Sequence, residues 1–139
     1  MAKDDIAILL VEDDDVDVMN VQRAFKRNNV LNPLHVARNG LEALDMLRTP
    51  GMLNPYPKII LLDINMPKMN GLEFLEEVRK DEELKKLSVF VLTTSNADRD
   101  RVEAYNLNVA GYIIKPVEMD NFLNAISSLH MYWKLIELP

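Results

Sequence analysis

Short runs of apolar residues divide the chain at regular intervals, and each run is continuous rather than alternating. Four clear runs occupy positions 6–11, 59–62, 89–92 and 112–114, and a weaker run occupies positions 34–37. Continuous apolar runs of this length are typical of strands in a parallel sheet, because helices cover both faces of such a sheet. The pattern therefore predicts five strands.

Between the predicted strands, apolar residues recur every three or four positions in three stripes and five positions apart in one, and a spacing of three or four is that of one helical face. The stripes are Val18, Val21 and Phe25; Leu72, Leu75 and Val78; Val102 and Leu107; and Phe122, Ile126, Leu129 and Trp133. Strands separated by helical crossovers pair in parallel. We therefore expect an α/β fold, a single doubly wound domain of five β-α units over residues 1–139. Residues 49–58 would form its one long loop, and residues 132–139 a C-terminal extension.

Composition limits the function classes. The chain has no cysteine and only two histidines, which argues against thiolate and histidine-rich metal sites, so any metal would be bound by oxygen. Its 16 basic and 22 acidic residues give a net charge of −6, which disfavours nucleic acid as a partner. The N-terminus is too acidic for a signal peptide and no run is long enough to span a bilayer, so we expect a cytoplasmic protein without membrane contact.

Polar residues follow the predicted strands at their carboxyl ends. They are Glu12 and Asp13 after the first strand, Asp63 after the third, Thr93 and Thr94 after the fourth, and Lys115 after the fifth. Ligands bind at this edge of a doubly wound sheet. Helix capping or a solvated face is the better interpretation of Asp14, Asp15 and Asp17. Capping does not explain a lysine beside two acidic strand ends.

Clustered carboxylates stay ionised at low cost only when a cation neutralises them. Two carboxylates, a carbonyl and several waters commonly hold Mg²⁺ beside a phosphoryl group, so we expect Mg²⁺ at this edge. A calcium loop beginning at Asp13 is excluded, because its sixth and twelfth positions are Val18 and Ala24 rather than Gly and Glu. Gly40 and Gly71 fit ordinary turns at helix starts.

Four segments together resemble the receiver domain of bacterial two-component response regulators. They are LLVED at 9–13, LDINMPKMNG at 62–71, VLT at 91–93 and GYIIKP at 111–116. The resemblance covers nearly the whole chain. The spacing also agrees with compact receivers such as the chemotaxis regulator, since Thr93 follows Asp63 by 30 positions and Lys115 follows it by 52.

The resemblance implies a flavodoxin-like parallel sheet with strand order 2-1-3-4-5, and phosphoryl transfer from a sensor histidine kinase. It implies these roles: Asp63 as phosphoacceptor; Asp13, Asp63 and the Asn65 carbonyl as Mg²⁺ ligands, with Glu12 acting through water; Thr93, Thr94, Tyr112 and Lys115 as phosphoryl-contacting or switch residues; and a cis peptide bond before Pro116. Receivers most often carry a smaller residue than Thr94 at that position, so its side chain would narrow access to Asp63.

The loop at 49–58 and the ending at 132–139 are similar to the single-domain response regulators that accompany bacterial phytochromes. This narrower resemblance implies a bacteriophytochrome as the kinase, and a homodimer. Trp133, Leu135, Ile136 and Leu138 form an apolar ending that is costly to expose. We expect these residues to pair with a second copy of the chain, and the alternative is that they fold back on their own domain.

Three function classes remain. The first is a phosphoacceptor that is not an enzyme, assists its own phosphorylation and dephosphorylation, and signals through contacts with a downstream protein. The second is a Mg²⁺-dependent phosphatase of the haloacid dehalogenase type, but Asn65 stands where that class has a second aspartate. The third is a receiver-like scaffold that needs no phosphorylation, and the complete set of Asp13, Asp63, Thr93 and Lys115 argues against it.

Overall fold

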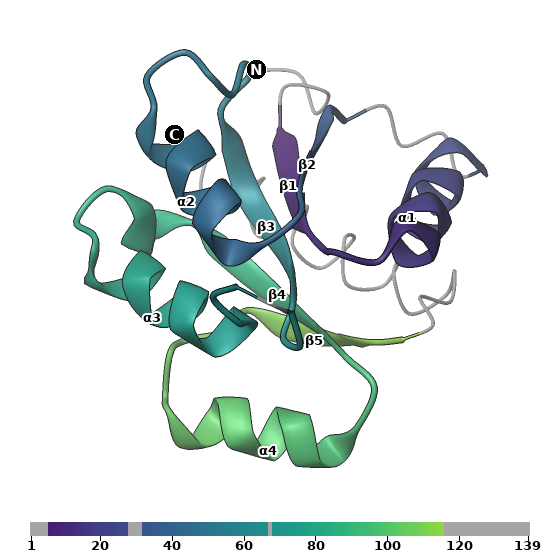
Figure 1. The fold of residues 1–139 in the computed structure, drawn as a ribbon, viewed down its shortest axis with the longest axis vertical. Coiled ribbons are helices and arrows are strands. Elements are labelled where there is room, and N and C mark those ends of the chain that lie inside the picture. The colour runs from purple at the N-terminus through teal and green to yellow at the C-terminus, as the bar shows by residue number, and fades with distance from the viewer. Residues whose placement is uncertain (1–5, 28–31, 67, 116–139) are drawn as a thin grey trace, which may run out of the picture.

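Strands and helices alternate along the chain in the computed structural model, which describes residues 6–27, 32–66 and 68–115 (Figure 1). The strands are β1 (Ala7–Val11), β2 (Leu34–Ala37), β3 (Pro57–Asp63), β4 (Ser88–Thr93) and β5 (Gly111–Ile114). The helices are α1 (Asp15–Arg27), α2 (Gly40–Arg48), α3 (Gly71–Lys80) and α4 (Asn96–Ala104), with a short 3-10 helix η2 (Leu84–Lys86).

All neighbouring strands pair in parallel, in the order β2-β1-β3-β4-β5. This confirms the predicted doubly wound, flavodoxin-like sheet. The register pairs Val11 of β1 with Leu62 of β3, and Asp63 of β3 with Leu92 of β4. The carboxyl ends of the central strands therefore meet at one edge of the sheet.

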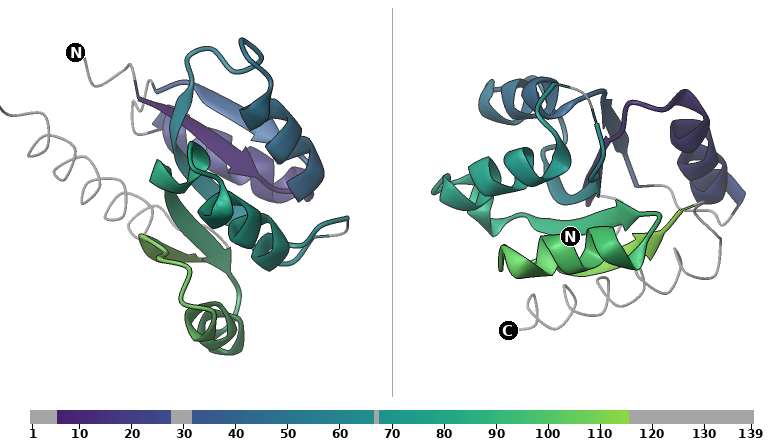
Figure 2. Two further views of the ribbon diagram at one scale, coloured as in Figure 1. Left: turned by 90° about the vertical axis from the view of Figure 1, so that its left-hand side faces the viewer. Right: turned by 60° about the horizontal axis from the view of Figure 1, so that its bottom comes forward.

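The sheet separates two apolar layers. Residues of α1 pack with Ile8, Leu10 and Leu61 on one face, and residues of α2, α3 and α4 pack with Leu9, Val11 and others on the opposite face. Figures 1 and 2 show α1 on its own side of the sheet, away from α2 and α3. Within the described residues, no helix combines the length and apolarity that crossing a bilayer requires.

Two predicted boundaries were wrong. β3 begins at Pro57, so part of the expected loop at 49–58 belongs to the sheet. α4 ends at Ala104, and Leu107 reaches the core from the following turn rather than from the helix. In that turn Asn106 and Asn108 have φ values of 52° and 54°, which reverse the chain toward β5 and which asparagine tolerates better than most residues.

Gly40 and Gly71 stand at helix starts where a side chain would come too close to neighbouring backbone atoms. A Cβ on Gly71 would lie 2.5 Å from the Ile64 Cα and 2.7 Å from the Asp63 carbonyl oxygen. A Cβ on Gly40 would lie 2.8 Å from the Met69 carbonyl oxygen. The absence of a side chain therefore lets α2 and α3 approach the β3-α3 connection closely.

The predicted fifth helix, the cis bond before Pro116 and the apolar ending with Trp133, Leu135, Ile136 and Leu138 lie outside the described residues. A cis peptide bond does occur elsewhere, between Asn54 and Pro55.

Candidate functional site

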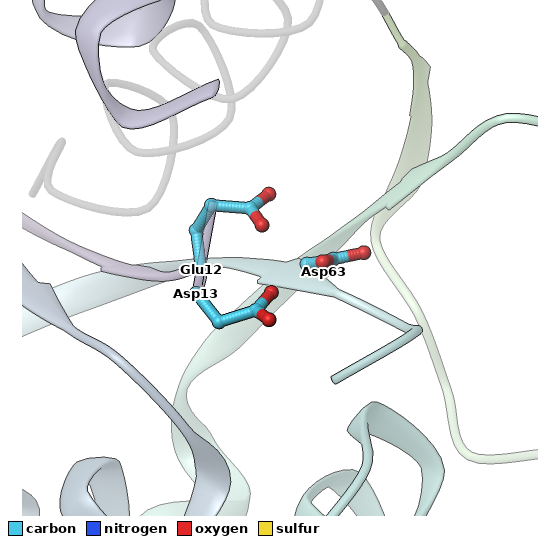
Figure 3. A group of neighbouring side chains, drawn as sticks. All are labelled: Glu12, Asp13 and Asp63. Carbon is cyan, nitrogen blue, oxygen red and sulfur yellow. The ribbon is translucent and has the colours of Figure 1, made fainter. Parts of the chain in front are cut away.

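Three carboxylates meet at the carboxyl edge of the sheet. Glu12 and Asp13 directly follow β1, and Asp63 is the last residue of β3, the neighbouring strand. One oxygen from each lies within 4.8 Å of those of the other two. In Figure 3 the Glu12 and Asp13 side chains leave opposite sides of the strand end, with both carboxylates turned toward the side where Asp63 lies. The structure therefore brings these three predicted site residues together.

Glu12 is the most deeply buried member of the cluster. Its side chain is fully buried, Asp63 is nearly so, and Asp13 is exposed. Burial and the nearby Asp63 raise the pKa of Glu12, Lys115 opposes both, and the net result is a pKa of about 8. Within the described residues the Glu12 Oε2 atom accepts no well-directed hydrogen bond, although it lies 2.8 Å from the Lys115 ammonium.

Lys115 reaches into the same pocket from the end of β5. Its Nζ lies 2.8 Å from Glu12 Oε2, 2.8 Å from Asp17 Oδ2 and 3.4 Å from Asp63 Oδ2. Burial alone would lower the pKa of Lys115, but the hydrogen bond to Asp17 and the negative charges of Glu12 and Asp63 raise it above its ordinary value. The single ammonium of Lys115 therefore offsets part of the negative charge of these three carboxylates.

Strand alternation explains why these side chains meet. Side chains two positions apart on a strand point to the same face of a sheet. Leu10, Leu61 and Ile113 all pack on the α1 face. Glu12, Asp63 and Lys115 each follow one of these residues by two positions, which carries their side chains toward α1.

Asp17 joins the pocket from α1, and its predicted role was wrong. Asp14 does cap α1, since its Oδ1 accepts hydrogen bonds from the backbone N–H groups of Val16 and Asp17. Asp15 pairs with Arg38 at the surface. The Asp17 carboxylate instead accepts a hydrogen bond from Lys115. The sequence shows an acidic run there, but not which of its members faces a residue 98 positions away.

Thr93 and Tyr112 lie on the opposite face of the sheet. Val91 pairs with Tyr112 in the register, and Thr93 follows Val91 by two positions, so all three side chains share the face covered by α2, α3 and α4. The Thr93 hydroxyl donates to the Ser95 carbonyl oxygen at 3.0 Å. Tyr112 is half-buried against the core. The hydroxyl and the ring predicted as a switch pair are therefore on one side of adjacent strands.

Asn65 and Thr94 are both exposed, and each lies just after the end of a central strand, Asn65 after β3 and Thr94 after β4. The Asn65 backbone N–H donates to Asp63 Oδ1 at 3.2 Å, and its side-chain Nδ2 donates to Asp98 Oδ2 at 2.9 Å. Asp98 lies in the first turn of α4, which Ser95 caps. Sequence reasoning missed Asp98, because nothing in its spacing distinguishes it from an ordinary acidic residue at a helix start.

The donor set fits a divalent cation. Glu12, Asp13 and Asp63 offer only oxygen ligands, which suit hard cations, and their mutual repulsion favours a positive charge between them. Lys115 already supplies one such charge to Glu12 and Asp63. The Glu12 oxygen without a well-directed hydrogen bond adds a second reason for a cation to bind there.

The chain is similar in sequence to known proteins. Residues 8–127 match the response regulator receiver domain family. The chain is 35% identical over 135 residues to the response regulator Rcp1 of Synechocystis, covering 95% of this chain and 92% of Rcp1. It is 37% identical over 133 residues to a probable methanogenesis regulatory protein, FilR2, of Methanothrix harundinacea, covering 95% of this chain and 86% of that protein.

Solved structures agree in fold. The bacteriophytochrome response regulator RtBRR superposes with a TM-score of 0.80 at 40% identity, covering 89% of this chain and 77% of RtBRR. The Mn²⁺-bound form of Rcp1 superposes with a TM-score of 0.72 at 35% identity, covering 92% of this chain and 94% of Rcp1. The fold and acidic edge thus define a phosphoacceptor protein of the flavodoxin-like type. The chain belongs to the response regulator receiver domain family.

Membership in this family establishes the general function. The chain is a response regulator receiver of two-component signalling, a non-enzymatic protein that a histidine kinase phosphorylates on an aspartate. This result favours the phosphoacceptor interpretation over the phosphatase and the scaffold.

Proposed function

We propose that Asp63 is the aspartate that receives the phosphoryl group. The observation that carries this assignment is the convergence of the Lys115 ammonium and two further carboxylates on the Asp63 side chain. Asp63 is nearly buried, yet its Oδ2 lies 3.4 Å from a positive charge, so an anionic group arriving there meets a cation rather than only carboxylates. Asp13 is the exposed member of the same acidic cluster.

In the proposed reaction an Asp63 carboxylate oxygen attacks the phosphorus of a phosphohistidine. A P–O bond forms as the P–N bond breaks, and the electron pair of that bond returns to the donor imidazole. Lys115 contacts the phosphoryl oxygens and offsets their charge, and the Thr93 hydroxyl leaves the Ser95 carbonyl to donate to another phosphoryl oxygen. Tyr112 then moves into the space that the Thr93 loop vacates, which changes the surface that a downstream protein contacts.

Mg²⁺ is the proposed cofactor, and it would supply positive charge that positions and neutralises the phosphoryl group. Asp13, Asp63 and the Asn65 carbonyl would hold it, with Glu12 acting through a bound water. With Lys115 and Thr93, these residues would assist phosphorylation and dephosphorylation of the same chain. The exposed Thr94 would limit which phosphodonors reach Asp63.

Intact mass after incubation with acetyl phosphate and Mg²⁺ tests the assignment. The wild-type chain should gain one phosphoryl group and Asp63→Asn none. Asp98→Asn is the matched control, since it removes a carboxylate outside the acidic cluster and should still be labelled. Asp13→Ala should lose Mg²⁺ binding and labelling together. Full labelling of Asp63→Asn would contradict the assignment, and many turnovers of p-nitrophenyl phosphate would instead favour a phosphatase.

We further propose that the kinase is a bacteriophytochrome in the cytoplasm. The similarity to RtBRR supports this partner. Phosphotransfer from a purified bacteriophytochrome kinase should be faster than from a chemotaxis kinase, and equal rates would contradict the proposal.

A homodimer is proposed for residues 1–139, treated as one receiver domain with an extension at 132–139. The apolar residues Trp133, Leu135, Ile136 and Leu138 support it, because their exposure to water is unfavourable. Light scattering should give twice the monomer mass for the full chain and one monomer mass for a chain stopped after Met131. A monomeric full chain, or a truncated chain that still dimerises, would refute the dimer.

A further inference from the structure

Lys115 has two close carboxylate partners, and only one of them belongs to the acidic cluster that can hold a metal ion. Glu12 Oε2 and Asp17 Oδ2 both lie 2.8 Å from its Nζ. Glu12 belongs to the oxygen cluster that can hold a metal ion, whereas Asp17 does not. Asp17 comes from α1 rather than from a strand end, and its side chain is 23% exposed against 11% for Lys115.

A divalent cation in the acidic cluster changes the position of least energy for the ammonium. In the metal-free protein the negative charges of Glu12 and Asp63 attract Lys115. A bound cation offsets those charges and also repels the ammonium directly. Lys115 then needs another anion within reach of its side chain. Asp17 already accepts a hydrogen bond from it and is free of the metal cluster.

We propose that Asp17 is a positioning residue that retains the ammonium of Lys115 near Asp63 when a divalent cation binds in the acidic cluster of Glu12, Asp13 and Asp63. Asp17 thereby relieves the competition between two positive charges for the same carboxylates, so that metal and lysine occupy the pocket together. An arriving phosphoryl group then finds Lys115 beside Asp63, since an ammonium has three donors and can keep Asp17 while it contacts an oxygen. This inference rests on the proposed metal site.

A purely local role does not account for Asp17. The cap of α1 is made by the Asp14 side chain, which accepts from the backbone of Asp17 and leaves the Asp17 carboxylate unused by the cap. A negative charge in the first turn also stabilises α1 through the helix dipole, but Asp15 does the same from the same turn. The contact with Lys115 is what distinguishes the two residues.

Mg²⁺ affinity of the full chain, measured by isothermal titration calorimetry, tests the proposal. Asp17→Asn keeps the shape and the acceptor oxygen but removes the charge, and it should weaken Mg²⁺ binding by about fivefold to tenfold. Asp15→Asn, the matched control on the same turn, should change it by less than about twofold, because Asp15 faces Arg38 at the surface. An Asp17→Asn protein with wild-type affinity would overturn the proposal.

A double-variant cycle separates positioning from simple loss of charge. In a Lys115→Met background, Asp17→Asn should change Mg²⁺ affinity by less than about twofold, because no ammonium remains to be retained. An undiminished effect there would show that Asp17 acts on the metal directly and would overturn the proposal. If Asp13→Ala keeps full Mg²⁺ affinity, the proposed metal site itself is wrong. If Asp13→Ala loses Mg²⁺ affinity and Asp17→Asn keeps it, the metal site stands and only the role of Asp17 is refuted.

A second measurement does not depend on the folding of Lys115→Met. In protein labelled with ¹³C and ¹⁵N lysine, the Lys115 side chain should keep the NMR shifts of a restrained ammonium when Mg²⁺ saturates the wild-type chain. In Asp17→Asn the same signals should move toward those of the exposed lysines on addition of Mg²⁺. Identical Mg²⁺-dependent shifts in both proteins would overturn the proposal.

Discussion

The guanidinium of Arg99 lies over the ring of Tyr112, with its Cζ atom 4.8 Å from the ring centroid. Arg99 belongs to α4, and Glu103 one turn later accepts a hydrogen bond from its Nε at 3.0 Å. Of the nine residues of α4, all of them described, Val102 is the one that is buried. A helix with so little buried surface opens easily, so its polar contacts with Tyr112 and Asn65 help to set its position.

Arg99→Ala should release both α4 and the Tyr112 ring. We expect a loss of about 0.5–1 kcal/mol in unfolding free energy, the usual size of an exposed cation-π contact, and faster amide hydrogen exchange in α4. Glu103→Gln is the control, since it weakens the pair with Arg99 and leaves the guanidinium over the ring. If exchange in α4 is equal in Arg99→Ala and the wild type, the ring contact does not hold the helix.

Glu12 should make the metal-free protein less stable as the pH rises. The unfolded chain releases this proton near the ordinary pKa of 4.5, and the folded chain near 8. Between these values the folded state binds more protons, so the contribution of Glu12 to the free energy of unfolding decreases from about pH 4.5 through about pH 8 and is constant above that range. Raised pH thus removes stability that is fully present below pH 4.5.

Urea denaturation in the presence of a chelator checks this expectation. Glu12→Gln should match the wild type near pH 4.5 and exceed it in stability at pH 9, because glutamine carries no charge to bury. Glu82→Gln, at an exposed position, should follow the wild type across the range. A difference between Glu12→Gln and the wild type that does not depend on pH would contradict the assignment of the titration to Glu12.

The fold could be predicted from the sequence because its central strands β1, β3 and β4 are buried on both faces. All five residues of β1 are buried, so that run carries no polar interruption and is read directly as a central parallel strand. The end of α4 could not be predicted in this way. Leu107 lies five positions after Val102, and it reaches the core from a turn whose left-handed residues Asn106 and Asn108 leave no periodic signal.

The site was predictable where a strand end places the residue, and less so elsewhere. Glu12, Asp63 and Lys115 follow apolar runs, so their position at one edge follows from the topology of the sheet. Asp17, Asp98 and Arg99 lie on helices, and the angle at which a helix packs decides which of its polar residues faces the pocket. That angle depends on the packing of the whole core and not on local spacing.

Arg79 should be essential for stability but not for phosphorylation chemistry. Its guanidinium donates to four carbonyl oxygens, those of Lys85, Leu87, Leu107 and Asn108, at 2.7–2.9 Å. It thereby joins the ends of two loops that precede β4 and β5. Arg79→Met should lose about 2–4 kcal/mol in unfolding free energy, since four carbonyl acceptors lose their donor and two of these hydrogen bonds, to Leu87 and Leu107, are partly buried.

The control for Arg79 is the neighbouring exposed Lys80, and Lys80→Met should change the unfolding free energy by less than about 0.5 kcal/mol. Well below its melting temperature, Arg79→Met should still be labelled by acetyl phosphate. A wild-type urea midpoint for Arg79→Met would show that the carbonyls are satisfied by water instead.

Gly71→Ala should disturb Asp63 through the backbone. The new Cβ would meet the Ile64 Cα at 2.5 Å and the Asp63 carbonyl oxygen at 2.7 Å, and neither atom belongs to a flexible side chain. The end of β3 must therefore move, with an expected loss of about 1–3 kcal/mol in stability and slower acetyl phosphate labelling than in the wild type.

Gly51→Ala is a destabilising control, because its φ of 79° disfavours alanine although no atom lies within 4 Å of the new Cβ. It should lose about 1 kcal/mol and keep the wild-type labelling rate, since the strain is far from Asp63 in the chain. Equal labelling rates in both variants would show that the close approach at Gly71 stabilises the fold without positioning Asp63.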